Sequence, residues 1–299
     1  MALKLSLGPV PYYWPREALL GFYEQAVEWP VDTIYLGEVV CPKRRNLKIT
    51  EWLELARRLA EAGKQVVLST ANLIEADADL RTLARLCENA EFLVEANDAA
   101  ALHLLAGRPF VSGPGVNVYN EHALDFLAGI GLRRWVLPFE LSRDTLADFQ
   151  ARRPPGVETE VFAFGRVPLA HSARCFTARA HGLPKDDCQL RCLDHPDGIA
   201  LWTREGEPFL VLNGVQVQSA QVYQLLGQIP ELQRLDVDYL RVAPLHWGTE
   251  VAVMAFADCL SGALAPDRGV ERLRTLSPLG LANGYWHGEP GRREVAIPA

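Results

Sequence analysis

Residues 33–69 read TIYLGEVVCPKRRNLKITEWLELARRLAEAGKQVVLS and contain one complete strand–helix–strand unit. Thr33–Gly37 and Gln65–Ser69 are short apolar runs, typical of strands that are buried on both faces of a parallel sheet. The helix between them is predicted to begin at Thr50, a suitable N-cap, and to stop at Gly63. The stretch therefore predicts a β–α–β repeat and a parallel sheet.

The same alternation continues along the rest of the chain. The predicted strands are residues 5–8, 33–37, 65–69, 91–95, 110–112, 134–138, 159–163 and 238–242. The predicted helices are residues 16–28, 50–62, 78–87, 98–105, 121–128, 142–149, 221–226 and 250–260. This pattern favours a (β/α)8, TIM-barrel-like fold, with one domain over residues 1–299. A doubly wound sheet is the alternative, because alternation alone does not show that the sheet closes.

One segment interrupts this alternation after the seventh predicted strand. Residues 169–218 do not lead directly into a helix. A polar, cysteine-bearing stretch comes first, and residues 199–203 and 209–212 then predict a β-hairpin with a Gly-containing turn. Long irregular insertions in compact domains usually carry function, so we expect a binding segment here.

Composition excludes some function classes. Lys and Arg number 30 against 37 Asp and Glu, which gives a net charge of −7. Broad nucleic-acid or anionic-membrane surfaces require a basic face, so neither nucleic acid nor a membrane surface is an expected partner. The sequence predicts no targeting segment and no membrane span, so we expect a cytoplasmic protein whose cysteines stay reduced.

The six cysteines fall into two groups. Cys87 lies on the apolar stripe of a predicted helix and Cys259 lies in an apolar run, so both are expected to pack in the core. The other four lie outside element interiors, with one after the second predicted strand and three in the insertion. They are Cys41, Cys175, Cys188 and Cys192. In a barrel both locations follow the carboxyl end of a strand, so the four cysteines can meet on one face.

Four thiolates suit zinc or an iron–sulfur cluster. The spacing Cys-x12-Cys-x3-Cys, with Cys41 remote, departs from the two close pairs of structural zinc sites and favours iron–sulfur. Zinc and unliganded thiols remain open. Several cations flank the cysteines and would balance an anionic cluster. They are Lys43, Arg44, Arg45, Arg174, Arg179, Lys185 and Arg191.

Three further residues are candidates for lining a site. Glu38 and Glu140 follow the carboxyl ends of two predicted strands, where barrel side chains line active sites. Capping of a helix or loop explains a carboxylate there equally well. Arg174 can orient an anionic substrate, or it can serve only to balance the charge of the cluster.

Several motifs identify the chain more closely. They include Leu5-Ser-Leu-Gly-Pro-Val10, Tyr35-Leu-Gly-Glu38 with Cys41-Pro-Lys-Arg-Arg45, and Ser172-Ala-Arg-Cys-Phe-Thr-Ala-Arg179 with its two downstream cysteines. The sequence resembles the collagenase-like peptidase superfamily, and in particular its members that act in ubiquinone biosynthesis. The resemblance implies a 4Fe–4S cluster held by the four cysteines outside the core.

The resemblance also implies partners and a reaction. It implies a heterodimer with a second cluster-bearing protein, a lipid-binding accessory factor, and a ubiquinone precursor as substrate. The implied reaction is the oxygen-independent hydroxylation of the precursor ring during anaerobic growth.

Peptidase activity and a non-catalytic scaffold are the alternative functions. The superfamily signature places a cysteine where this chain has Pro168 and a glycine where it has Ala173, although Glu160, Phe162 and Gly165 fit. Proline cannot act as a nucleophile, which argues against a peptidase. In the scaffold alternative, the cluster only holds the insertion in place and the partner performs the chemistry.

Overall fold

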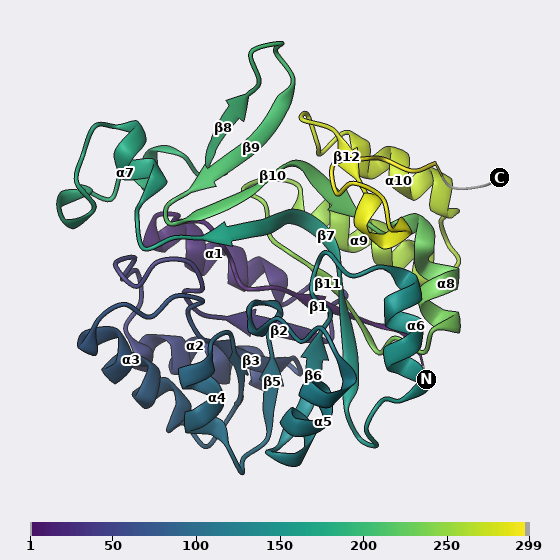
Figure 1. Cartoon of the computed structure of the whole chain (residues 1–299), viewed down its shortest axis with the longest axis horizontal. Helices are drawn as coiled ribbons and strands as arrows, with labels where there is room; N and C mark the ends of the chain where they lie inside the picture. The colour runs from purple at the N-terminus through teal and green to yellow at the C-terminus, as the bar shows by residue number, and fades with distance from the viewer. Residues whose placement is uncertain (1, 297–299) are drawn as a thin grey trace.

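Eight parallel strands form a closed ring in the computed structural model, which describes residues 2–296 (Figure 1). The ring closes because the last of its strands pairs with both the seventh and the first. Its strands are β1 (Lys4–Leu7), β2 (Thr33–Leu36), β3 (Gln65–Ser69), β4 (Leu93–Ala96), β5 (Phe110–Ser112), β6 (Leu132–Val136), β7 (Glu158–His171) and β11 (Tyr239–Val242). This closure confirms the predicted barrel and excludes the doubly wound sheet.

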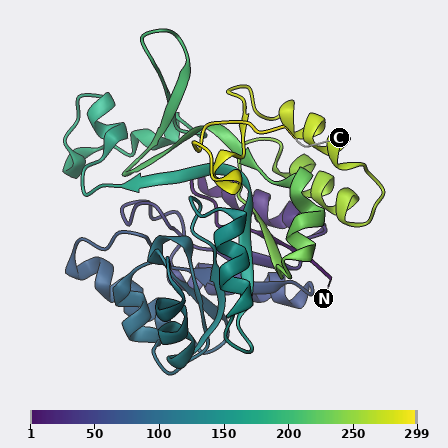
Figure 2. The ribbon, with the colours of Figure 1, turned by 45° about the vertical axis from the view of Figure 1, so that its right-hand side comes forward.

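The helices lie around the outside of the ring (Figures 1 and 2). They are α1 (Arg16–Ala26), α2 (Ile49–Glu61), α3 (Asp77–Cys87), α4 (Ala99–Leu105), α5 (Glu121–Gly129), α6 (Arg143–Ala151), α8 (Ile229–Arg234), α9 (Thr249–Leu260) and α10 (Pro266–Arg274). One large apolar cluster fills the space between helices and ring, and it includes Cys87, with Cys259 packed against it. Core packing of both cysteines is thus confirmed.

Local sequence explains where several helices start and stop. The side-chain oxygens of Asp98 and Asn120 accept backbone N–H groups of α4 and α5 at 2.9 Å, and Ser142 caps α6 in the same way at 3.3 Å. These caps satisfy amides that have no partner within the helix. Gly63 ends the turn after α2 with φ +88°, in the left-handed region that glycine adopts without strain.

The region after β7 differs from the prediction in three respects. The predicted helix at residues 221–226 is wrong, because Gln216–Gln224 is strand β10. Strand β7 is longer than predicted and continues to His171. Three helices here were not predicted, namely α8, α10 and the short helix α7 (Phe176–Ala180). The hairpin is confirmed as β8 (Ile199–Trp202) and β9 (Pro208–Asn213).

These extra strands form a second layer above the ring, in which every pairing except the short parallel one of β10 with β12 is antiparallel. Strand β10 pairs with the outer part of β7 and with β9, and β12 (Leu281–Ala282) pairs with β10. The hairpin β8–β9 projects from this layer, and the short helix α7 (Phe176–Ala180) lies beside it (Figures 1 and 2). The insertion therefore lies over the carboxyl ends of the barrel strands.

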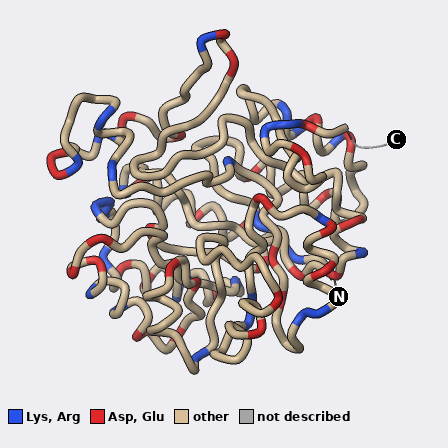
Figure 3. The backbone as a smooth tube through the Cα atoms, viewed as in Figure 1, with Lys and Arg blue, Asp and Glu red and all other residues tan. Residues whose placement is uncertain are grey.

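Charge is spread over the molecule. Figure 3 shows Lys and Arg interspersed with Asp and Glu along the tube, with no face reserved for one sign. Within residues 2–296, no helix has the length and apolar character needed to cross a bilayer.

Candidate metal centre and barrel-mouth cavity

The four cysteines predicted to bind a metal line one small cavity. Cys41 enters it from the loop after β2, and the other three enter it from the segment between β7 and β8. They are Cys175, Cys188 and Cys192. Lys43, Arg44 and Arg191 of the flanking cations also line this cavity. The barrel thus brings together residues that lie up to 151 positions apart in the sequence, from 41 to 192.

Cys175 is held at the start of α7. It is the N-cap residue, and its Sγ accepts the backbone N–H of Ala178 at 3.4 Å. The helix is fixed to the turn between β9 and β10, because the N–H of Phe176 donates to the carbonyl of Gly214 at 2.8 Å. The N–H of Gly214 in turn donates to the hydroxyl of Thr177 at 2.9 Å. The outer layer therefore positions this thiol.

Cys188 and Cys192 belong to two short 3-10 turns, η2 (Lys185–Asp187) and η3 (Arg191–Asp194). Between the turns, Gln189 and Leu190 have φ values of 49° and 50°. Two successive left-handed residues are uncommon outside glycine, and they change the direction of the chain sharply here. This reversal lets both thiols reach the same cavity.

A lysine joins the two sides of the cavity. The Nζ of Lys43, two residues after Cys41, donates to the carbonyl of Lys185 and to the carboxylate of Asp186, both at 2.9 Å. Its partners lie in and beside the turn that ends at Cys188. The contact therefore connects the loop after β2 to the insertion.

Arg44 is the buried cation of the cavity, with 4% of its surface exposed. Its Nη1 donates to the carbonyl of Pro11 at 2.9 Å and its Nη2 to the side-chain oxygen of Asn213 at 2.7 Å. Its Nε is buried and, within the described part of the chain, has no hydrogen-bond partner. A buried N–H without a partner is costly, so this donor fits a site for an anionic group.

The donor set fits an iron–sulfur cluster. A structural zinc site would gather its four thiolates around a single ion. A four-iron cluster instead binds thiolates at separate irons and is anionic overall. Burial raises the pKa of Cys41 to about 11, so this thiol must lose a proton when it binds a metal.

The three other candidate residues have different locations. Glu38 supports the loop of Cys41, since its carboxylate accepts the N–H groups of Val40 at 2.9 Å and Cys41 at 3.0 Å. Burial raises the pKa of Glu38, although Arg44 opposes this shift. Glu140 lines a second cavity and accepts the hydroxyl of Tyr119. Arg174 is exposed and lines neither cavity.

This second cavity has a volume of about 350 Å³ and lies at the mouth of the barrel. Apolar and polar side chains line it, and they come from the ends of the ring strands and from the outer layer. Residues that line it include Phe139, Phe162, Glu95, Asn97, Arg166, His171, Gln218 and Arg241. The barrel-mouth cavity is the place where barrels of this kind bind ligands.

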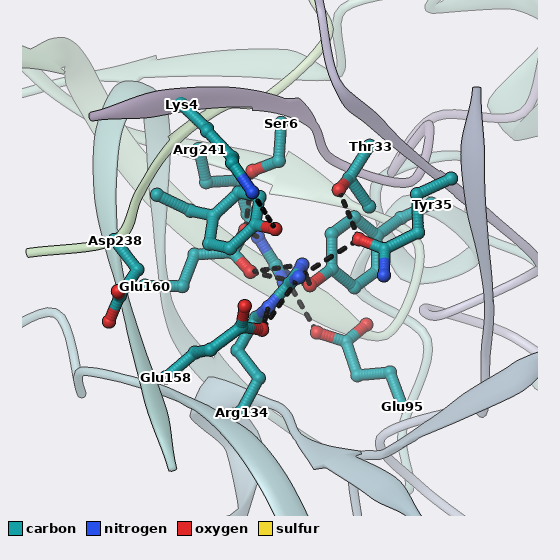
Figure 4. Close-up of polar contacts among 12 residues, drawn as sticks. Lys4, Ser6, Thr33, Tyr35, Glu95, Arg134, Glu158, Glu160, Asp238 and Arg241 are labelled. Carbon is teal, nitrogen blue, oxygen red and sulfur yellow. Dashed lines mark hydrogen bonds and ion pairs between the residues drawn. The ribbon is translucent and has the colours of Figure 1, made fainter. Parts of the chain in front are cut away.

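The floor of the barrel-mouth cavity continues into a charged network inside the ring (Figure 4). The carboxylate of Glu160 accepts the hydroxyls of Ser6 and Tyr35 at 2.5 Å and the Nε of Arg241 at 2.7 Å. Arg134 lies 3.6 Å from Glu160 on the other side. Burial alone would raise the pKa of Glu160, but Arg241 and Arg134 outweigh it and hold this pKa below its usual range.

Sequence reasoning did not identify this network or most of the cavity. Glu95 and Arg241 were assigned to strands without a role, and Glu160 was matched only to the superfamily signature. Charged residues inside otherwise apolar strand segments were the available signal, because such residues are rarely buried unless they are paired.

Comparisons with known proteins agree with this fold. A model of peptidase family U32 matches residues 21–295. A putative dihydrodipicolinate synthetase from Pseudomonas aeruginosa is similar with 10% identity and a TM-score of 0.50, over 93% of this chain and 83% of that one. The U32 peptidase Mk0906 has 12% identity and a TM-score of 0.46, over 82% and 94% of the two chains. Dihydropteroate synthase from Anaplasma phagocytophilum has 10% identity and a TM-score of 0.43, over 88% and 100%.

Proposed function

Because the chain belongs to peptidase family U32, we propose that it is a UbiV-like member of that family. In this role it is the 4Fe–4S subunit of a UbiU–UbiV type heterodimer. The heterodimer hydroxylates the ring of a ubiquinone precursor without oxygen during anaerobic growth. The observation that carries the proposal is that four cysteines, remote in sequence, line one cavity beside the barrel mouth.

The surroundings of the cysteines support this role. When bound, the cluster supplies one-electron transfer. Cys41, Cys175, Cys188 and Cys192 would hold it as thiolates. The guanidinium of Arg44 and the ammonium of Lys43 would balance the negative charge of the cluster, and Glu38 fixes the loop of the first thiol.

The remaining parts of the proposal concern partners and location. A UbiU-like protein with its own cluster would complete the heterodimer, and a lipid-binding accessory factor would present the precursor, whose tail is insoluble in water. We place this assembly in the cytoplasm.

The peptidase alternative has no structural support beyond the family name. Pro168 occupies the position of the signature cysteine and lies in β7, where it lines the barrel-mouth cavity. It offers no nucleophile there. In the scaffold alternative the cluster is bound but takes no part in the reaction. An experiment that changes the cluster without unfolding the chain distinguishes this alternative from the proposal.

The first test measures metal content and sulfide. The chain is purified without air, and iron, acid-labile sulfide and zinc are measured together with the visible spectrum. About four iron and four sulfide per chain are expected, with broad absorption near ~400 nm. One zinc without sulfide would overturn the cluster assignment.

Cysteine variants then test the ligands. Cys175→Ala should lose the iron while retaining the fold, whereas the matched variant Cys259→Ala should keep it, since Cys259 packs against the core. Hydroxylation of the precursor by the complex with the UbiU-like partner should disappear with the iron. An unchanged hydroxylation rate when zinc replaces the cluster would instead favour the scaffold, and peptide cleavage by the isolated chain would favour the peptidase.

A further inference from the structure

We propose that the barrel-mouth cavity binds a neutral aromatic ring that carries oxygen acceptors, and that Arg241 and Arg166 donate to those oxygens. This inference rests on the proposed function, because such a ring is the group to be hydroxylated. It goes beyond that function by naming the cavity, the donors and the charge of the ligand.

Two buried donors of this cavity lack partners. Within residues 2–296, the Nη2 of Arg241 and the Nε of Arg166 have no hydrogen-bond partner, and both side chains line the barrel-mouth cavity. Arg241 is 4% exposed. Because a buried N–H without a partner is costly, two of them at one cavity indicate a ligand with oxygen acceptors.

Pairing already balances the charges of these arginines. Arg241 donates through Nε to Glu160 and through Nη1 to Glu95, both at 2.7 Å. Arg166 lies 3.8 Å from the carboxylate of Asp197 and donates to the hydroxyl of Tyr12 at 3.2 Å. The carboxylate of Glu140 also lines the cavity and would repel an anion. The cavity therefore favours a neutral ligand over an acid.

The walls of the cavity suit a flat apolar ring. Phe139 and Phe162 line it and pack edge to face, with ring centroids 4.9 Å apart. Pro9, Pro11 and Pro168 add rigid apolar surface. A volume of about 350 Å³ lies at the lower end of the range for small-molecule sites and accommodates one substituted ring.

One arginine connects this cavity to the cysteines. The carbonyl of Pro11, a residue of the barrel-mouth cavity, accepts the Nη1 of Arg44 at 2.9 Å. Arg44 itself lines the cavity of the four cysteines. A ring bound in the barrel-mouth cavity would thus be separated from the proposed cluster by Pro11 and Arg44.

Binding of small probes to the purified full-length chain tests the proposal. The probes are para-methoxyphenol, the oxygen-free analogue para-ethyltoluene, which has nearly the same shape, and the anion para-methoxybenzoate. Dissociation constants come from ligand-observed NMR titrations. With two hydrogen bonds at stake, we expect para-methoxyphenol to bind roughly tenfold more tightly than para-ethyltoluene. Equal affinities, or tighter binding of para-methoxybenzoate, would overturn the proposal.

Two variants localise the binding. Arg241→Lys keeps a cation for Glu95 and Glu160 but replaces the rigid guanidinium, and with it the separate Nη2 donor, by a single ammonium nitrogen that the two carboxylates engage. The tenfold preference should therefore fall to about threefold. Ala243→Leu fills the cavity that Ala243 lines and should abolish binding of both neutral probes. The matched control Ala257→Leu lies on α9, outside the cavity, and should leave binding unchanged.

Thermal unfolding monitors the fold of each variant, and Ala243→Leu keeps the test decisive if Arg241→Lys does not fold. Unchanged binding in Ala243→Leu would show that the probes bind elsewhere and would overturn the assignment. Iron content and hydroxylation are read separately, so failure of the ring site is distinguishable from failure of the cluster proposal.

Discussion

The guanidinium of Arg44 donates to the side-chain oxygen of Asn213 at 2.7 Å, across 169 positions of sequence. This contact connects the loop that carries Cys41 to the turn between β9 and β10, which in turn holds the helix of Cys175. Both residues are buried, so the contact is protected from water. The cysteine cavity thus has a polar framework that joins its two sides.

Replacing Arg44 by Gln should lower both the stability of the chain and the reduction potential of the proposed cluster. The loss of charge-assisted hydrogen bonds costs about 1.5–3 kcal/mol each in buried settings. A missing cation disfavours the more negative, reduced cluster, so the potential should shift downward. Redox titration followed by EPR measures the shift. Arg45→Gln, at the exposed neighbouring position, is the control, and an equal shift in both variants would contradict the role of Arg44.

Gly214→Ala should destabilise the cysteine cavity more than an ordinary glycine substitution does. Gly214 has φ +66°, and a Cβ there would lie 2.7 Å from the Nη2 of Arg44. The matched control is Gly206→Ala, at φ +86° with open space around the Cβ, which should cost about 1–2 kcal/mol from backbone strain alone. Chemical denaturation compares the two. Equal losses of unfolding free energy in the two variants would contradict this prediction, because they would show that Arg44 moves away from the new Cβ without an energetic cost.

Glu160→Gln should remove part of the acid sensitivity of the chain. Because Arg241 and Arg134 hold the pKa of Glu160 below its ordinary value of about 4.5, the carboxylate stabilises the fold above that pH. This contribution is lost as the pH falls through the lowered pKa. The variant should be about 3–5 kcal/mol less stable at neutral pH. Its unfolding free energy should fall less steeply than that of the wild type below pH ~4.5. Parallel pH profiles would contradict the ion-pair account.

His171→Gln should reduce a second, milder loss of stability in acid. Burial lowers the pKa of His171 from its ordinary value of 6.5, and its ring lies 3.0 Å from the side-chain nitrogen of Gln216. The neutral ring therefore stabilises the fold above pH ~6.5, and this contribution declines as the pH falls through the lowered pKa. Thermal unfolding measured from neutral pH to pH ~5 should show a flatter profile for the variant. The exposed His122 offers the control variant His122→Gln.

The ring strands could be predicted because their sequences are short apolar runs separated by amphipathic helices. Strand β10 was missed because Gln216 and Gln218 are buried in it, which reverses the usual relation between polarity and exposure. Their amides bond to each other and to neighbours such as His171, a pattern that only the folded structure supplies.

The cysteine set could be selected because thiols outside regular elements have few structural roles. The barrel-mouth cavity could not be predicted from the sequence, because its hydrogen-bond donors come from different strands, and the pairing of those strands must be known first. Arg241 has two carboxylate partners from other strands, Glu95 of β4 and Glu160 of β7. The free third donor becomes visible only after these two pairs are assigned.

The length of β7 has a practical consequence for protein engineering. One backbone segment serves first as a ring strand, paired with β6 and β11, and then as part of the outer layer, paired with β10. A chimera that exchanged residues 169–218 with a relative would cut this shared strand and its partner within their ladder. Exchange boundaries just after Phe164 and at Gln224, which face each other in register, would move β8, β9, β10 and the outer part of β7 together. Only the short pairing of β10 with β12 would then join exchanged to retained strands.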